Sequence, residues 1–159
     1  MDSAVDLETA FLPFRENTLK REAPAPQAQE PCRKSVTLPK KILVVEDDFH
    51  SREALKAILL AEGYGVETSE DGLQVIKKMK EDGFGIAIID INLPPVLNVP
   101  IDGWDLIRII RAFNPAICII LVSGEKGVKE RAELFRVSAF LEKPISPSQL
   151  KATLSNLDR

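Results

Sequence analysis

The sequence has no long hydrophobic run and contains few cysteine and aromatic residues. Among its 159 residues are two cysteines, one tryptophan, one tyrosine and one histidine. No apolar stretch approaches the roughly 20 residues that a membrane-spanning helix needs. The N-terminal stretch MDSAVDLETAFLPF begins with acidic residues, whereas a secretory signal begins with basic ones. We therefore expect no membrane span, no secretory signal and a cytoplasmic location.

The composition also excludes two classes of site. Cys32 and Cys118 have no metal-ligand spacing and supply no disulfide framework. The formal net charge is -3, with 21 basic and 24 acidic residues interleaved, so the basic face of a nucleic-acid-binding protein is not expected. A content of 45% hydrophobic and 28% charged residues predicts one domain with a normal core and room for a tail.

Residues 1–40 are rich in proline, with the stretch APAPQAQEP at their centre. This composition is typical of a flexible or extended arm. Its one apolar cluster is FLPF (11–14), for which docking onto the domain or a partner is the alternative to an incidental place in the arm. We predict an N-terminal arm over residues 1–40, followed by a domain over residues 41–157.

From Lys41 onward, short apolar runs alternate with segments of helical periodicity. The runs are ILVV (42–45), YGVET (64–68), IAIID (86–90), ICIILV (117–122) and AFLE (139–142). Helical spacing is shown by Leu55, Ile58 and Leu59, by Leu106, Ile109, Ile110 and Phe113, by Val128, Ala132 and Phe135, and by Leu150, Leu154 and Leu157.

This alternation predicts the fold class. Runs that are apolar at every position belong to strands covered on both faces, which favours a parallel sheet. Right-handed crossovers then place helices on both sides of the sheet. We predict an α/β fold of the (βα)5 type, with a doubly wound parallel five-stranded sheet in the flavodoxin-like order 2-1-3-4-5.

Reactive side chains stand at the carboxyl ends of these strands, where such sheets bind ligands. Residues 46–48 (Glu-Asp-Asp) follow the first strand, Asp90 closes the third, Ser123 follows the fourth and Lys143 the fifth. The predicted strand order brings all these groups to one edge. Like charges repel, so clustered carboxylates at a strand end need a cation or a proton. For residues 46–48 alone, the alternative is a solvated loop whose acids favour the dipole of the next helix.

Together these groups suit phosphoryl chemistry. Carboxylates from two adjacent strand ends form a hard-oxygen site for Mg²⁺, which takes few protein ligands and keeps waters that a phosphate can replace. Asp90 is the central carboxylate and the candidate nucleophile, Lys143 can neutralise a phosphoryl oxygen, and the Ser123 hydroxyl can donate to another. Phosphoryl transfer requires mainly positioning and charge neutralisation. No Walker-type glycine loop is present, so no bound nucleotide is implied.

In this order, the residues resemble the receiver domain of two-component response regulators. The resemblance covers residues 41–157 and rests on ILVVEDD, on IIDINLP followed by DGWDLIRIIR, on LVSG and on FLEKPI. It implies a signalling phosphoacceptor and not an enzyme acting on a separate substrate. Asp90 would accept a phosphoryl group from a histidine kinase or histidine phosphotransfer protein, and phosphorylation would change the affinity for a downstream protein target.

The resemblance also implies a magnesium site and a rate-tuning pair. Asp47 and Asp90, with the backbone carbonyl of Asn92, are similar to the family's Mg²⁺ ligands. Glu46 is similar to the outer acid that acts through water, and Asp48 then falls outside the pocket. Asn92 and Glu125 occupy positions that tune the loss of the phosphoryl group, and this pair implies fairly rapid autodephosphorylation.

A switch is implied by the same resemblance. Ser123 resembles the hydroxyl that rotates toward the phosphoryl group. The alternative role for Ser123 is simply to cap a turn with Gly124. Lys143 resembles the basic contact, with a cis peptide bond to Pro144. Phe140 occupies the position of the switch aromatic, for which ordinary core packing is the alternative.

Two segments depart from the family pattern. After LP, relatives reach DG almost directly, whereas here the seven residues PVLNVPI (95–101) intervene. This extended loop would shield Asp90 or shape the partner surface, and a tolerated surface insertion is the alternative. RVSAF (136–140) replaces the usual glycine-containing approach to the last strand, which leaves the geometry of the preceding helix open. That helix, strand 139–142 and the final helix form the family's output face, which is a candidate homodimer surface.

Only the residues DR follow the final helix in this sequence, which predicts a stand-alone regulator without direct DNA binding. One alternative is a receiver fragment of a hybrid histidine kinase, with the proline-rich arm as linker. Another is a receiver-like interaction module that is not phosphorylated. A phosphatase of the haloacid dehalogenase kind would require an Asp-x-Asp pair at its first strand, and this sequence lacks one.

Overall fold

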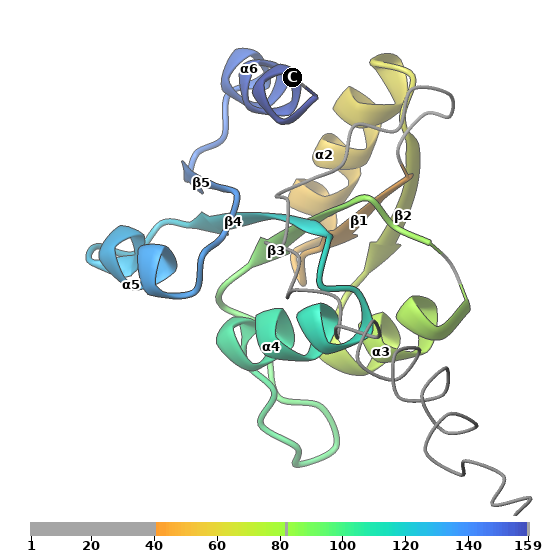
Figure 1. The fold of residues 1–159 in the computed structure, drawn as a ribbon, viewed down its shortest axis with the longest axis vertical. Coiled ribbons are helices and arrows are strands. Elements are labelled where there is room, and N and C mark those ends of the chain that lie inside the picture. The colour runs from red at the N-terminus through yellow and green to blue at the C-terminus, as the bar shows by residue number, and fades with distance from the viewer. Residues whose placement is uncertain (1–40, 82, 159) are drawn as a thin grey trace, which may run out of the picture. The chain divides into compact units, whose positions relative to one another are not determined.

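The computed structural model describes residues 41–81 and 83–158 as a five-stranded sheet flanked by helices (Figure 1). The strands are β1 (Lys41–Val45), β2 (Gly65–Ser69), β3 (Ile86–Asp90), β4 (Cys118–Ser123) and β5 (Ala139–Glu142). The helices are α2 (Phe49–Ala61), α3 (Gly72–Glu81), α4 (Gly103–Phe113), α5 (Val128–Leu134) and α6 (Pro147–Leu157). All strand pairs are parallel, and the sheet order is β2-β1-β3-β4-β5.

The predicted α/β fold class and strand order are therefore confirmed, with each strand within one residue of its predicted bounds. The predicted arm over residues 1–40 lies outside the residues that the structure describes. Within residues 41–81 and 83–158, no helix is both long enough and apolar enough to cross a membrane.

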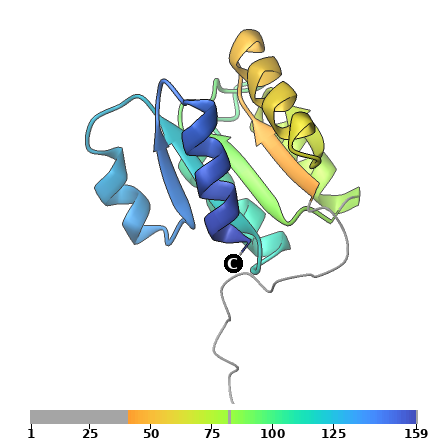
Figure 2. The ribbon, with the colours of Figure 1, turned by 90° about the horizontal axis from the view of Figure 1, so that it is seen from above.

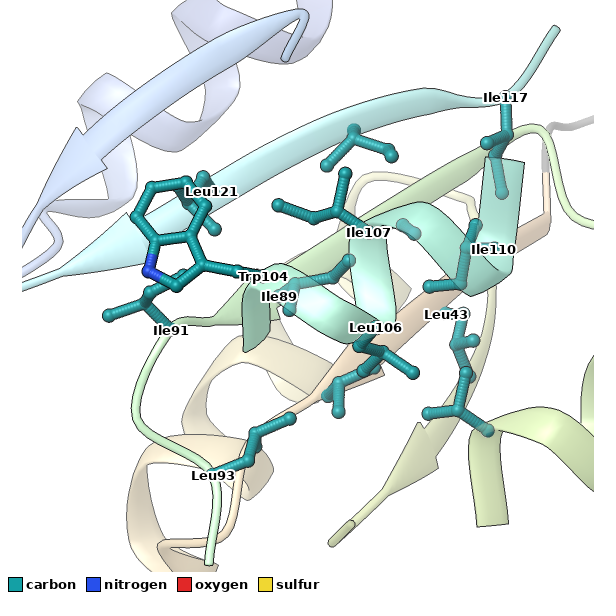
Figure 3. Close-up of a cluster of buried hydrophobic side chains, with 14 of the residues drawn as sticks. Leu43, Ile89, Ile91, Leu93, Trp104, Leu106, Ile107, Ile110, Ile117 and Leu121 are labelled. Atoms are coloured by element: carbon teal, nitrogen blue, oxygen red, sulfur yellow. The ribbon is translucent and has the colours of Figure 1, made fainter. Parts of the chain in front are cut away.

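The sheet is covered on both faces, as the apolar runs predicted. All five residues of β3 and all six of β4 are buried. Helices α3, α4 and α5 pack on one face through a cluster that includes Leu43, Ile89, Leu106, Ile110 and Leu121 (Figure 3). Helices α2 and α6 cover the other face (Figure 2) through a cluster that includes Ile42, Leu59, Ile88, Ile120 and Leu150. Successive strand residues alternate between the two clusters, because side chains along a strand point to opposite faces.

Helix α4 buries two of the four residues that its spacing predicted, Leu106 and Ile110, and leaves the other two more exposed. The prediction included Ile109 and Phe113, but Phe113 is 46% exposed and Ile109 is only partly covered. The buried residues are Gly103, Trp104, Leu106, Ile107 and Ile110. Both sets fit a helical period, so periodicity could not choose between them. Trp104 lies on the buried side, and the centre of its ring lies 4.7 Å from that of Phe135.

Side-chain caps fix where α4 and α6 begin. The Asp102 carboxylate accepts the N–H of Asp105 at 2.8 Å, and the Ser146 hydroxyl accepts the N–H of Gln149 at 3.1 Å. Pro147 occupies the first helical position of α6, where its missing N–H has no cost. Both helices therefore start close to the carboxyl ends of β3 and β5, at the edge where the reactive residues lie.

The seven-residue insertion after Pro94 forms a small hairpin. Val96 and Val99 exchange both backbone hydrogen bonds, at 3.3 and 2.8 Å. Between them, Leu97 and Asn98 have φ values of 49° and 61°. Two consecutive left-handed residues are the signature of a type I′ turn, the usual two-residue connection of a hairpin. The insertion is therefore an ordered hairpin with its tip at Leu97.

The approach to β5 uses an unusual residue in place of glycine. Helix α5 ends at Leu134, and Arg136 takes a φ of 53°, in the left-handed region that glycine favours. Arg111 of α4 donates a hydrogen bond to the backbone carbonyl of Arg136. This contact from a neighbouring helix shows how RVSAF reaches β5 without a glycine.

Candidate functional site

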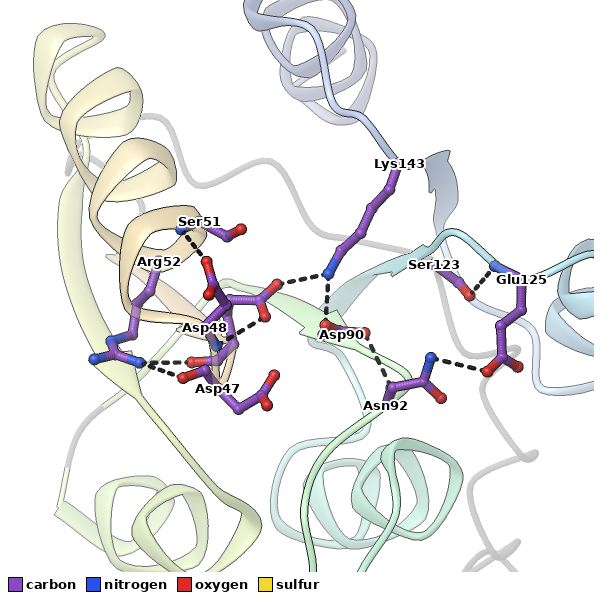
Figure 4. A network of polar contacts seen from close by, with 10 residues as sticks. Asp47, Asp48, Ser51, Arg52, Asp90, Asn92, Ser123, Glu125 and Lys143 are labelled. Carbon is purple, nitrogen blue, oxygen red and sulfur yellow. Dashed lines mark hydrogen bonds and ion pairs between the residues drawn. The ribbon is translucent and has the colours of Figure 1, made fainter.

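The predicted site residues converge at the carboxyl edge of the sheet (Figure 4). Glu46 and Asp47 follow β1, Asp90 closes β3, Ser123 closes β4 and Lys143 follows β5. Three of them are almost fully buried, because Glu46 is 2%, Asp90 5% and Ser123 0% exposed, whereas Asp47 is exposed. Residues far apart in the sequence thus form one group around the end of β3.

One lysine bridges two buried carboxylates. The Lys143 ammonium lies 2.7 Å from Asp90 Oδ2 and 3.0 Å from Glu46 Oε2. Burial disfavours the Lys143 ammonium, but its hydrogen bonds to Asp90 and Glu46 outweigh this effect and raise the pKa of Lys143. Burial raises the pKa of Glu46 to about 7; Lys143 opposes this shift, and the charge of Asp90 adds to it. Two buried carboxylates, Glu46 and Asp90, thus share one positive charge, that of Lys143.

The carboxylates also fit a divalent cation. Glu46, Asp47 and Asp90 each offer a ligand oxygen, and these oxygens all lie within 4.8 Å of one another. Carboxylate oxygens in such a group suit Mg²⁺. The backbone N–H of Asn92 donates to Asp90 Oδ1 at 3.0 Å, while Lys143 contacts the other oxygen. These contacts orient the Asp90 carboxylate from both sides.

Arg52 supports the acidic loop, and the sequence analysis missed it. This side chain of α2 is 6% exposed. Its guanidinium donates to the backbone carbonyls of Glu46 and Asp47 at 2.9 and 3.2 Å, and to the Glu70 carboxylate at 3.2 Å. A sequence signal existed, because Arg52 lies one helical turn before Leu55 and shares its buried side. A charge on an apolar helix face requires buried partners.

We expect Arg52→Ala to lower the free energy of unfolding by about 2–4 kcal/mol, because two loop carbonyls lose their donor. Urea denaturation followed by circular dichroism measures this change. The matched control is Arg108→Ala, whose side chain is 68% exposed and whose loss should change stability by no more than about 0.5 kcal/mol. Equal effects of the two substitutions would show that Arg52 does not support the loop.

A second polar group lies on the other side of Asp90. The Ser123 hydroxyl accepts the backbone N–H of Glu125 at 3.0 Å. The Asn92 side-chain amide donates to the Glu125 carboxylate at 3.0 Å. The two residues predicted to tune phosphoryl loss are therefore in direct contact, and Ser123 makes the turn contact that its alternative interpretation described.

Asp48 lies outside this group, as predicted. Its carboxylate caps α2 by accepting the N–H of Ser51 at 2.8 Å. This hydrogen bond lowers the pKa of Asp48. Asp48 therefore starts the helix that carries Arg52, while Asp47 faces the site.

The geometry agrees with comparisons to known proteins. Residues 42–155 match the family model described as the response regulator receiver domain. The chain belongs to this family. Over 116 residues it is 32% identical to the transcriptional regulatory protein ZraR of Klebsiella oxytoca, a match that covers 72% of this chain and 25% of ZraR. The chain thus spans only about a quarter of the length of that relative.

Solved structures give the same family. The chain is similar to the chemotaxis protein CheY4 of Vibrio cholerae, with a TM-score of 0.67 and 25% identity over 76% of this chain and 99% of that one. It is also similar to the response regulator TrrA of Thermotoga maritima in complex with Mg²⁺-BeF, with a TM-score of 0.65 and 28% identity over 74% and 98% of the two chains. Because the chain belongs to the receiver family, the alternative of a phosphatase of the haloacid dehalogenase kind is excluded.

Two remaining features of the receiver domain lie at β5. The peptide bond between Lys143 and Pro144 is cis, as the resemblance implied. Phe140 is partly buried against the cluster beneath α4 and α5. It also lines a groove of about 390 Å³ that includes Lys129 of α5 and Gln149 of α6. Phe140 therefore connects the core to the face formed by α5, β5 and α6.

Proposed function

We propose that this receiver domain is a phosphoacceptor in which Asp90 takes a phosphoryl group from a phosphohistidine. The observation that carries the proposal is the setting of the Asp90 carboxylate. It is buried, lies 2.7 Å from the Lys143 ammonium, and has the Glu46 and Asp47 ligand oxygens within 4.8 Å. An oriented carboxylate beside fixed positive charge is suited to nucleophilic attack on phosphorus.

Transfer of the phosphoryl group to Asp90 requires no general base, because the carboxylate is already ionised. One Asp90 oxygen forms a bond to phosphorus while the bond between phosphorus and the histidine nitrogen breaks, and its electron pair remains on that nitrogen. The product is an aspartyl phosphate. The Asn92 N–H holds the Asp90 carboxylate in place, Lys143 neutralises a phosphoryl oxygen, and the Ser123 hydroxyl donates to another.

A magnesium ion fits beside the acceptor. Glu46, Asp47 and Asp90, with the backbone carbonyl of Asn92, are the groups that would hold it, Glu46 through water. When bound, Mg²⁺ supplies charge neutralisation to the phosphoryl oxygens. Burial raises the pKa of Glu46 to about 7, and a cation beside it would favour its charged form. The related TrrA structure, which carries Mg²⁺-BeF, gives further support.

The proposed output is a change in protein contacts. The new phosphoryl charge draws the Ser123 hydroxyl toward it, and Phe140 turns inward, which alters the face of α5, β5 and α6. The partners are a histidine kinase or phosphotransfer protein and a downstream protein target, with this face as a candidate homodimer surface. The expectation of no direct DNA binding gains no support from the relatives, because ZraR is named a transcriptional regulatory protein and this chain spans 25% of it.

Incubation with acetyl phosphate tests the function. We expect intact mass to show a gain of one phosphate in the presence of Mg²⁺ and none when EDTA removes the metal, because the crowded acids then repel the phosphoryl oxygens. If rapid sampling finds no adduct although Mg²⁺ binding is measurable, the phosphoacceptor proposal fails for this donor and an interaction module remains.

The same experiment reports the lifetime of the adduct. The contact between Asn92 and Glu125, at 3.0 Å, places the rate-tuning pair at the mouth of the site. We expect fairly rapid autodephosphorylation, followed by mass after the donor is removed. A phosphoryl group that survives unchanged for many hours would argue against the role given to this pair.

A further inference from the structure

The hairpin between β3 and α4 has an apolar tip that is not buried against the rest of the domain. Leu97 is 81% exposed and Val99 is 52% exposed. Leu97 also adopts a φ of 49°, which is disfavoured for a residue with a side chain larger than that of glycine. Asparagine or glycine is the usual residue at such a position. A strained apolar residue without packing partners points to a role outside the domain's own stability.

The tip is held firmly. Val96 and Val99 pair through both backbone hydrogen bonds, and the N–H of Ile101 donates to the Val99 carbonyl at 3.0 Å. Ile101 packs against the buried cluster of α3 and α4. One of its methyl groups lies 3.0 Å from where a Cβ on Gly72 would stand, so a side chain at Gly72 would require Ile101 to shift. Figure 1 shows the loop projecting beyond α4. The hairpin is thus a rigid projection on a packed base.

The hairpin also lies close in the chain to the site at which a donor protein reaches Asp90. Leu97 is five residues beyond Asn92, at the mouth of the site. Five residues of backbone span at most about 17 Å. A protein that seats a phosphohistidine over Asp90 covers roughly 800 Å² of the receiver surface, an area roughly 30 Å across. The hairpin therefore lies no farther away than about the edge of that area, where a donor protein can contact it and a small donor cannot.

We propose that the hairpin of residues 96–99 is a docking element for the protein that delivers the phosphoryl group to Asp90, with Leu97 as its apolar contact. This inference rests on the proposed phosphoacceptor function. A hairpin backbone that is fixed before binding loses little conformational entropy on association, which favours affinity. The hairpin thereby selects among donor proteins while leaving the chemistry at Asp90 unchanged.

Phosphotransfer from protein and small donors tests the proposal in the full chain. The protein donors are the histidine kinases and phosphotransfer proteins of the source genome, each purified, labelled with radioactive phosphate and mixed with wild-type chain. The fastest donor is then used with Leu97→Asn, because asparagine tolerates the left-handed conformation and removes the apolar tip. We expect kcat/KM to fall about tenfold through KM, and the rate with acetyl phosphate to stay within about twofold.

Two further variants separate docking from structure. Leu97→Met keeps an apolar tip and should retain most of the wild-type rate. Leu134→Asn is the matched control, because Leu134 is 82% exposed at the end of α5 and lies outside the proposed footprint. All three variants should keep a Tm within about 4 °C of the wild type, since none loses a buried contact.

Three results would be decisive against one or the other proposal. Equal rates for Leu97→Asn and wild type with the fastest protein donor would overturn the docking role. Labelling of the wild type by acetyl phosphate but by none of the protein donors would overturn it as well. A wild-type chain that takes no phosphate from acetyl phosphate or from any protein donor would instead overturn the phosphoacceptor function, so the two failures are distinguishable.

Discussion

Asp90→Asn takes up no phosphate from acetyl phosphate under conditions in which the wild-type chain gains one. The amide has neither the negative charge nor the nucleophilic oxygen of the carboxylate. It also replaces one of the three carboxylates whose ligand oxygens lie within 4.8 Å of one another by a neutral amide, so Mg²⁺ affinity should fall too. Intact mass spectrometry after incubation with Mg²⁺ and acetyl phosphate measures the loss, and circular dichroism shows that the variant is folded.

The matched control for this variant is Asp48→Asn. Asp48 lies in the same acidic stretch as the proposed ligands, but it is exposed and caps α2. We expect it to label at the wild-type rate, with at most about 1 kcal/mol of stability lost from the cap because asparagine is also a good cap. Phosphate uptake by Asp90→Asn equal to that of the wild type would place the acceptor elsewhere and remove the central assignment.

Gly103→Ala should destabilise the fold by about 3 kcal/mol or more. A Cβ on Gly103 would lie 2.6 Å from the Cα of Ile91 and 2.8 and 2.9 Å from the carbonyl oxygens of Ile91 and Asp90. These are backbone atoms of the segment that leaves β3, so no side-chain rotation can relieve the clash. The free energy of unfolding from urea denaturation measures the effect.

The control for this substitution is Gly83→Ala, because no atom lies within 4 Å of a Cβ at Gly83. Its effect should be within about 0.5 kcal/mol. The Gly103 variant should also take up phosphate more slowly in its folded fraction, since Asp90 and Ile91 must shift to admit the methyl group. Equal stability of the two glycine variants would contradict the close contact between the start of α4 and the end of β3.

The site buries two carboxylates beside a single lysine. Glu46 and Asp90 are 2% and 5% exposed, and burial of a charged carboxylate is unfavourable unless it is paired. Lys143 serves both carboxylates, and burial raises the pKa of Glu46 to about 7. A divalent cation bound there would add the missing positive charge. The carboxylates at this edge therefore suit a divalent cation.

The fold and the position of the site followed from sequence patterns. Short apolar runs identified the strands to within one residue, and the runs that are apolar throughout predicted a parallel sheet. In such a sheet the carboxyl ends of neighbouring strands meet, so Asp47, Asp90 and Lys143 were placed together before any contact was known. These inferences need only the residue types and the order of the elements along the chain.

Other features depended on where helices and loops settle in three dimensions. Periodicity assigned α4 a stripe through Phe113, whereas the helix buries Ile107 and Trp104, whose ring packs on Phe135. Arg52 was overlooked because its partners are backbone carbonyls, and a sequence pattern carries no information on which carbonyls lack a donor. The insertion became a hairpin through paired backbone groups of Val96 and Val99.

The sequence by itself determined the fold class, the strand order and the edge of the sheet at which the chemistry lies, because each follows from local periodicity and general rules of chain connection. The tertiary structure decided which atoms touch. Lys143 meets Glu46 across 97 positions of sequence, and Leu97 remains exposed on a packed base. Contacts of this kind depend on angles and distances between whole elements, which no local pattern specifies.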